Sequence, residues 1–331
     1  MLNILLYIFL LLNLAASAQH PNLREEIRKA VKQKLSFDES ALYNSYIEGS
    51  MGSARYRTLD EVVSFTEMVL ESYPEIAGRV DLSKFGNPTG KGRFLTVLRL
   101  GNQNVPPNDQ KAILLDGAHH SREPTSVQMV LYTTLSLLYE YEKEEALSKG
   151  GGIVHQLWRD HSIYVIPVVN VDGYQEISEY WKEHGRLEMV RKNFKNDATK
   201  VCRGNNEDVG VDLNRNYDFA FGIDDLGSSG DPCAEDFRGR SAFSEPATKQ
   251  VKTFLEETTE GQSVKIALNF HAYGNLLVHP FSYLNQSFSS EHMVKYRASL
   301  LQGMLKGTLC SNDGEMYSIN NKFGVCEYST N

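Results

Sequence analysis

The sequence lacks several patterns that would place a protein in a class at once. It has no run of lysine or arginine, and its formal net charge at pH 7 is −8. Nucleic-acid-binding chains usually carry clustered basic residues, so we expect no nucleic acid as a partner. After its first 18 residues the chain has no apolar run long enough to span a bilayer. Internal repeats and low-complexity tracts are also lacking. A chain of 331 residues that is 41% hydrophobic can instead bury a large core in one α/β domain.

The first 18 residues differ from the rest. Residues 4–12 are nearly all apolar, and Ala16-Ser17-Ala18 fits a cleavage signal of small residues before Gln19. No Lys or Arg precedes the apolar stretch, but the free amino terminus partly supplies that charge. The stretch is too short to cross a membrane. We therefore interpret residues 1–18 as a signal peptide rather than a buried helix, and expect the mature protein to be secreted or lumenal, without a membrane anchor.

Cysteine is scarce, with four in the whole chain. In an oxidising compartment these residues can form disulfides. Cys310 and Cys326 could form a bridge or remain free thiols, and the sequence leaves both alternatives open.

Apolar periodicity divides the chain into two parts. Within residues 19–55, a four-residue repeat of Leu23, Ile27, Val31 and Leu35 predicts an amphipathic helix, which we expect to dock on the following domain. From residue 56 to 331, apolar strand patterns alternate with helical ones. This alternation predicts an α/β fold with a mixed, mainly parallel twisted sheet sandwiched between helices. We expect strands at 94–100, 112–115, 162–169 and 264–271, and helices at 59–70, 125–147, 244–257 and 291–306. The motif Thr58-Leu59-Asp60-Glu61 is a capping box that predicts the start of the first helix, and Asn170-Val171-Asp172-Gly173 predicts a turn after the third strand.

A possible metal site follows one of these strands. The apolar run at 113–115 leads into a polar turn in which His120 and Glu123 are three residues apart. An imidazole and a carboxylate on one turn are a frequent way to hold zinc, and His271, at the end of another apolar run, supplies a third ligand. Two histidines, one glutamate and an open position make a hydrolytic zinc site. The His-x-x-Glu spacing alone would be weak evidence, because it often occurs by chance among surface residues.

Three motifs in register strengthen this interpretation: His120-Ser121-Arg122-Glu123, Asp212-Leu213-Asn214-Arg215-Asn216 and His271-Ala272-Tyr273. Together they resemble the zinc metallocarboxypeptidases, the family of the pancreatic carboxypeptidases, from about residue 56 to about residue 317. The resemblance implies one zinc ion, the metallocarboxypeptidase fold, and hydrolysis of the C-terminal residue of peptides or proteins. Pancreatic relatives carry a long folded pro-domain, and the segment at 19–55 is too short to be one.

The resemblance also implies roles for individual residues. Zinc would lie between His120, Glu123 and His271, with water in the fourth position. Asp212 matches a carboxylate that hydrogen-bonds the first histidine and fixes its tautomer. Asn214 and Arg215 match a clamp for the substrate's terminal carboxylate, which a planar guanidinium binds bidentately.

Further residues match the family less closely. Arg122 fits a position that contacts upstream substrate, and Tyr317 lies near the position of a mobile tyrosine that covers the bound terminus. His119 is expected to be a bystander. The resemblance also implies a disulfide between Cys202 and Cys233, which flank the second motif.

The chain departs from the family at two catalytic positions. The arginine that stabilises the oxyanion is replaced by Phe194, although the following Lys195 could supply positive charge if the register shifts. The catalytic glutamate, which acts as general base, should lie well beyond Tyr317. Glu327 follows after ten residues, roughly half the expected interval, and is at most a weak candidate.

Three hypotheses therefore remain from the sequence. The chain is an active secreted carboxypeptidase, a catalytically inactive homologue that binds zinc or peptide, or a truncated gene model whose C-terminal part is missing after Asn331. A deacylase of the same superfamily is a weaker alternative, because the Asn214-Arg215 clamp and the signal peptide suit peptides better. The preferred C-terminal side chain, the physiological substrate and the oligomeric state cannot be read from the sequence.

Overall fold

A computed structural model describes residues 22–37, 41–148, 151–193, 210–259, 264–273, 276–278 and 318–320. The predicted signal peptide and the helix expected at 291–306 lie outside these residues. So do several residues named above: Phe194, Lys195, Cys202, Cys310, Tyr317, Cys326 and Glu327.

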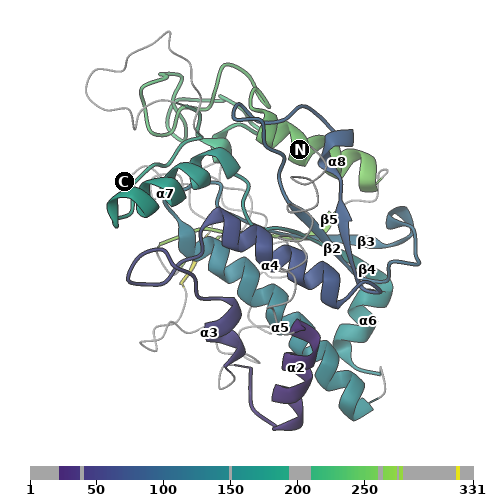
Figure 1. Ribbon diagram of the computed structural model, residues 1–331. Helices are drawn as coiled ribbons and strands as arrows, with labels where there is room; N and C mark the ends of the chain where they lie inside the picture. Colours follow the sequence, from purple (N-terminus) through teal and green to yellow (C-terminus); the bar gives the residue numbers. More distant parts are fainter. Residues whose placement is uncertain are drawn as a thin grey trace, which may run out of the picture.

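A five-stranded mixed sheet with the order β1-β2-β4-β3-β5 forms the centre of the fold (Figure 1). β2 pairs antiparallel with β1 and β4, whereas β3 pairs parallel with β4 and β5. The predicted α/β fold with a mixed sheet is confirmed. The strands are β1 (Ala77–Val80), β2 (Val97–Leu100), β3 (Lys111–Gly117), β4 (His161–Ile166) and β5 (Val264–Phe270), and a separate parallel pair joins β6 (Leu276–Val278) to β7 (Ser318–Asn320).

Helices cover the sheet. In Figure 1, α4 and α5 lie below the sheet and α8 lies above it. On the α8 side, the ring of Tyr164 in β4 meets that of Phe254 edge-on, with centroids 5.0 Å apart. The helices are α2 (Leu23–Lys32), α3 (Leu42–Tyr46), α4 (Leu59–Ser72), α5 (Pro124–Ser148), α6 (Ile153–Asp160), α7 (Val171–His184) and α8 (Pro246–Thr259).

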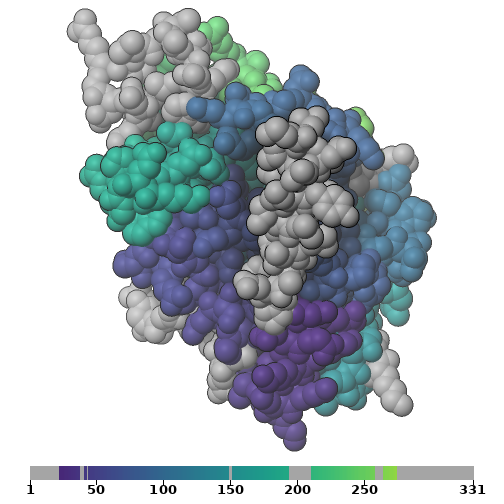
Figure 2. All heavy atoms as spheres, viewed as in Figure 1, coloured from purple at the N-terminus to yellow at the C-terminus, as the bar shows by residue number. Residues whose placement is uncertain are grey.

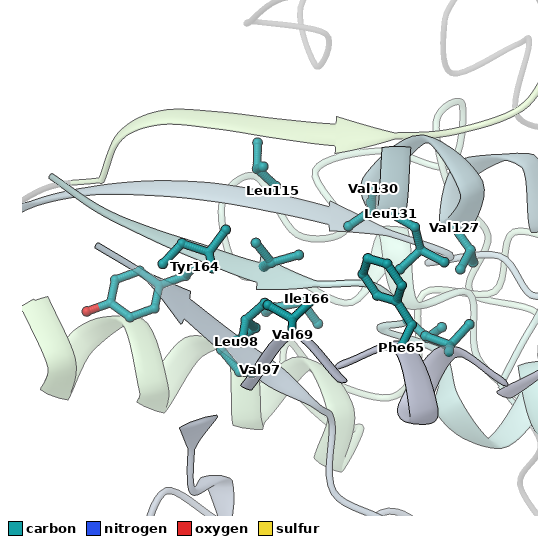
Figure 3. Close-up of a cluster of buried hydrophobic side chains, with 14 of the residues drawn as sticks. Phe65, Val69, Val97, Leu98, Leu115, Val127, Val130, Leu131, Tyr164 and Ile166 are labelled. Carbon is teal, nitrogen blue, oxygen red and sulfur yellow. The ribbon is translucent and has the colours of Figure 1, made fainter. Parts of the chain in front are cut away.

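The capping box predicted at the start of α4 is present. The Thr58 hydroxyl accepts a hydrogen bond from the Glu61 backbone N–H, and the Glu61 carboxylate accepts one from the Thr58 backbone N–H. The backbone N–H groups of Thr58 and Glu61, which have no partner within the helix, are thereby hydrogen-bonded. Behind this cap, Phe65 and Val69 are fully buried and join the core between α4 and the sheet (Figure 3). The same figure shows members of this core from four other elements: Val97, Leu98, Leu115, Val127, Val130, Leu131 and Ile166.

Helix α5 connects the core to the candidate site. It begins at Pro124, directly after Glu123, and proline is favoured in the first turn of a helix because its missing N–H would be unsatisfied there anyway. Val127, Val130 and Leu131 then bury one face of its first turns. Burial of that face fixes the helix start, and with it the turn that carries the polar motif.

The amphipathic helix predicted near the amino terminus is present as α2 and packs on α5. It lies at the surface, at the lower end of the face in Figure 2. Leu23 and Ile27 are fully buried, and Arg24 and Arg28 each donate to one carboxylate oxygen of Glu142, at 2.6 and 2.7 Å. Glu142 is itself buried in α5. This segment is therefore held by both apolar and ionic contacts.

The sequence missed several short or disguised elements. Strand β1 and helix α6 are only four and eight residues long. The segment Asn170–Gly173, expected as a turn, begins α7: the Asn170 side chain accepts from the Gly173 N–H and caps the helix. No helix among the described residues is long and apolar enough to span a membrane.

Candidate metal centre

His120, Glu123 and His271 converge at the carboxyl ends of β3 and β5. These strands are adjacent and parallel, with Gly117 opposite Phe270, so the segments that follow them leave the sheet at the same edge. His120 Nδ1 lies 2.8 Å from Glu123 Oε1, and His271 Nδ1 lies 2.9 Å from Glu123 Oε2. One ligand atom from each of the three residues lies within 4.8 Å of the other two. The arrangement brings two imidazole nitrogens and a carboxylate to a common point.

The turn between β3 and α5 is fixed by buried hydrogen bonds. The Ser126 hydroxyl donates to the Glu123 carbonyl at 2.6 Å and accepts from the Ala118 N–H at 2.9 Å. The Ser121 hydroxyl donates to the Val190 carbonyl at 2.6 Å. Ala118, Ser121 and Ser126 are all fully buried. The positions of His120 and Glu123 therefore follow from a turn that has little freedom to move.

Asp212 lies behind His120. Its Oδ1 is 3.1 Å from His120 Nε2, and its Oδ2 accepts from Nε and Nη2 of Arg191 at 3.1 and 2.8 Å. The carboxylate is fully buried. Burial acts to raise the pKa of Asp212, but His120, Arg215 and Arg191 together lower it well below its ordinary value. Asp212 therefore stays ionised and keeps a proton on His120 Nε2, the far nitrogen of the ring as seen from the cluster. The near nitrogen, Nδ1, faces Glu123.

The protonation of the cluster determines how it can bind a cation. Burial acts to raise the pKa of Glu123, but hydrogen bonds from His120 and His271 outweigh it and lower the pKa. Burial acts to lower the pKa of His120, yet Asp212 and Glu123 raise it. A metal must displace the proton on His120 Nδ1, so binding should weaken as the pH falls.

The residues of the second motif lie beside the cluster. The Asn214 amide nitrogen is 3.4 Å from His271 Nε2. Arg215 is half-buried and donates from Nε to the Gly227 carbonyl at 2.7 Å and from Nη1 to the Asn214 carbonyl at 3.2 Å. These bonds orient the guanidinium relative to Asn214. Arg122 donates from Nη1 and Nη2 to the carboxylate of Glu235 at 3.0 and 3.3 Å, and its contact with upstream substrate remains a prediction.

His119, which the sequence suggested to be a bystander, is buried next to the cluster. Its Nε2 lies 2.8 Å from the Tyr217 hydroxyl, and its ring stacks on that of His271. Burial and the neighbouring imidazoles lower the pKa of His119 well below its ordinary value, so its ring is neutral. Its place directly after a buried strand was the one signal in the sequence that it would be enclosed.

Several predicted roles cannot be placed. Lys195, Tyr317 and Glu327 lie outside the described residues, so their roles at the oxyanion, over the substrate terminus and as general base remain predictions. Cys233 is described but Cys202 is not, so the disulfide between them remains a prediction for the same reason.

Comparisons with known proteins agree with the motifs. The family profile of the zinc carboxypeptidases matches residues 62–322. Mast cell carboxypeptidase A from Mus musculus is 32% identical over 262 residues, which cover 79% of this chain and 53% of that protein. An inactive metallocarboxypeptidase, ecm14 of Sclerotinia sclerotiorum, is 30% identical over 199 residues, which cover 58% of this chain and 30% of that protein.

The fold is similar to that of a solved relative. The structure of bovine thrombin-activatable fibrinolysis inhibitor in complex with tick carboxypeptidase inhibitor matches with a TM-score of 0.59 and 26% identity, covering 83% of this chain and 79% of that one. The chain spans about half the length of the mast cell carboxypeptidases that it matches.

Proposed function

Because the chain belongs to the zinc carboxypeptidase family, we propose that it is a secreted exopeptidase that removes the C-terminal residue of peptides or proteins. The observation that carries this proposal is the convergence of His120, Glu123 and His271 on one point, with Asp212 behind the first histidine. Secretion rests on the cleavage signal at residues 16–18.

The donor set fits zinc. Two imidazole nitrogens and one carboxylate leave a fourth position for water or substrate, as in catalytic rather than structural zinc sites. A zinc ion held there supplies Lewis acidity and lowers the pKa of its bound water to about 7. Asp212 orients His120 and increases its basicity as a ligand.

Arg215 and Asn214 would hold the substrate by its free carboxylate. Asn214 lies beside His271, so a terminus bound at this pair would place the last peptide bond near the metal position. The hydrogen bonds from Arg215 to two backbone carbonyls orient its guanidinium before substrate arrives. Such preorganisation lowers the entropy lost on binding.

A catalytically silent zinc- and peptide-binding protein is the second candidate. It is favoured by Phe194, which stands where the family has its oxyanion arginine, and by the relative that is named inactive. The two candidates share the metal and the clamp, and they differ in whether a general base such as Glu327 acts on the water.

The test uses matched peptides with free and amidated C-termini. If Arg215 binds the terminal carboxylate, amidation should weaken binding by about 2 kcal/mol or more, or roughly 30-fold, because the guanidinium loses a charged partner. Arg215→Gln should abolish this difference. Arg79→Gln is the control, because Arg79, in β1, pairs with Glu67 of α4 at the surface. Equal affinities for the two peptides in the wild-type protein would refute the clamp.

Turnover and zinc content separate the two candidates. Purified protein should contain about one zinc, and His271→Ala should lose it, because two protein ligands are too few for the site. Atomic absorption measures this directly. Hydrolysis of free-acid peptides that is lost in Glu123→Ala identifies an enzyme, whereas peptide binding without hydrolysis identifies the silent homologue. Equal zinc content in wild type and His271→Ala would contradict the metal centre.

A further inference from the structure

The two histidines of the candidate centre are supported differently. The far nitrogen of His120 faces the buried carboxylate of Asp212 at 3.1 Å. The far nitrogen of His271 instead lies 3.4 Å from the amide nitrogen of Asn214, which makes a weak contact at best. A third of the His271 side chain is exposed, whereas that of His120 is almost fully buried. Histidine ligands usually rely on a partner at the far nitrogen to fix the ring. Among the described residues that nitrogen has no stronger partner, so other contacts must orient the His271 ring.

The ring of His119 is placed to supply that orientation. The two imidazoles are stacked, with centroids 5.9 Å apart and an interplanar angle of 28°. His271 is also bounded by His120, whose ring is tilted at 48° with its centroid 4.8 Å away. The imidazole of His271 thus lies against two buried rings, and rotation about its side-chain bonds would break the stacked contact with His119.

His119 is itself fixed at both nitrogens. Nε2 lies 2.8 Å from the Tyr217 hydroxyl, and Nδ1 lies 3.3 Å from the Asn269 amide nitrogen. The Tyr217 ring is held in turn, edge-on to Phe243 with centroids 5.7 Å apart. Because both nitrogens of His119 are engaged away from the cluster, it is not placed to act as a metal ligand.

We propose that His119 is a positioning residue of the metal centre: its clamped imidazole forms a flat surface that fixes the ring plane of His271. The inference rests on the proposed function, since it assumes that His271 binds the metal. An apolar side chain could fill the same volume, but it would not present a planar face. The role depends on ring shape and on the bonds that hold the ring, so substitutions can separate it from simple packing.

The test compares four variants of the full chain by zinc affinity and by cobalt substitution. His119→Leu removes the planar face, His119→Phe keeps a planar ring without the nitrogens, and Tyr217→Phe removes one bond of the clamp. His155→Leu is the control: it also removes a stacked histidine, in this case one in α6 that packs on Tyr141 of α5, away from the strand ends that carry the centre.

Zinc affinity is measured by competition with a chromophoric chelator. We expect His119→Leu to bind zinc about tenfold or more weakly, the range typical for loss of a residue that supports a ligand. His119→Phe should recover most of the affinity, Tyr217→Phe should fall between, and His155→Leu should match the wild type. The visible spectrum of the Co²⁺ protein should change in His119→Leu and return towards the wild type in His119→Phe.

Three results would overturn the inference. Folded His119→Leu with wild-type zinc affinity and an unchanged cobalt spectrum would exclude a positioning role. Equal losses in His119→Leu and His119→Phe, in proportion to lowered melting temperatures, would show that His119 only packs the core. If the wild-type protein does not bind zinc, the proposed function is overturned as well. This result is distinguishable from the other two, in which the wild type binds zinc.

Discussion

Replacing Asp212 by asparagine tests the electrostatic centre of the site. The substitution keeps the shape of the side chain but removes its charge. The carboxylate accepts two hydrogen bonds from Arg191 and one from the Asn214 N–H at 2.9 Å, and it faces His120. All of these contacts lie in a region from which water is excluded, since Asp212 and Arg191 are almost fully buried.

The loss of stability can be estimated from these contacts. Removing one partner of a buried ion pair leaves the other charge uncompensated, at a cost of about 3–5 kcal/mol. The entropy of unfolding is about 2.1 cal/mol/K per residue, or roughly 0.7 kcal/mol/K for 331 residues. The melting temperature of Asp212→Asn should therefore fall by about 4–7 °C. Zinc affinity should fall by about 10–100-fold, because Asn no longer polarises His120.

The pH dependence gives an independent check on the metal-free protein. The folded-state pKa of Asp212 is depressed, so its charge stabilises the fold above the unfolded pKa of about 3.9. That contribution is lost as the pH falls through the folded pKa. The difference in stability between wild type and Asp212→Asn should therefore be full at pH 6–7 and shrink below about pH 4.

Asp172→Asn is the matched control. Asp172 is also buried and accepts from Thr89 at 2.8 Å and from Arg93 at 3.1 Å, but it belongs to α7 rather than to the metal cluster. It should lower the melting temperature without changing zinc affinity. Calorimetry and chelator competition on both variants are sufficient. If Asp212→Asn melts within about 1 °C of the wild type and binds zinc equally well, the reasoning from the buried ion pair is wrong.

Two further predictions concern other buried carboxyl groups. Asp116 makes no hydrogen bond through Oδ1 within the described structure, and burial raises its pKa to about 8. Between about pH 4 and pH 8 Asp116 therefore ionises in the unfolded chain but stays protonated in the folded protein, which lowers the stability of the fold as the pH rises. The stability advantage of Asp116→Asn over wild type in metal-free protein should grow across that range to a few kcal/mol; an advantage independent of pH in urea unfolding would contradict this. Glu142→Gln leaves Arg24 and Arg28 without their shared carboxylate, so we expect α2 to detach more readily and trypsin to cleave near it sooner than in wild type. Unchanged cleavage would mean that the apolar contacts of α2 suffice.

The sequence was a good guide to the elements that determine the site. Strands β3 and β5 are visible as apolar runs, and the Thr58 capping box predicts the start of α4. The convergence of His271 with Glu123, 148 residues apart, is not contained in either segment alone. It follows from the parallel pairing of two strands. The resemblance to a family implied that the two residues share a zinc site, but the pairing itself came from the structure.

The sequence was a poor guide where tertiary contacts decide a residue's environment. Arg191 stands in a polar segment and gave no sign that it would be buried against Asp212, because its partner belongs to another motif. His119 has the same local pattern as its neighbour His120, yet its nitrogens face Tyr217 and Asn269. Asn170 was assigned to a turn, because a capping residue and a turn residue have the same chemistry until the following segment is seen to be helical.

The register of β3 and β5 has a consequence for how the chain assembles. The pairing shifts by one residue between Ala112 and Ile113, and only after that shift does Phe270 lie opposite Gly117. A slip of one residue in a strand turns its side chains to the other face, so His271 can meet Glu123 in one register alone. A metal ion that needs both residues would bind the finished pairing and reject its misaligned competitors. Zinc binding should therefore stabilise this strand alignment over a slipped one, since mass action favours the state that binds the ion.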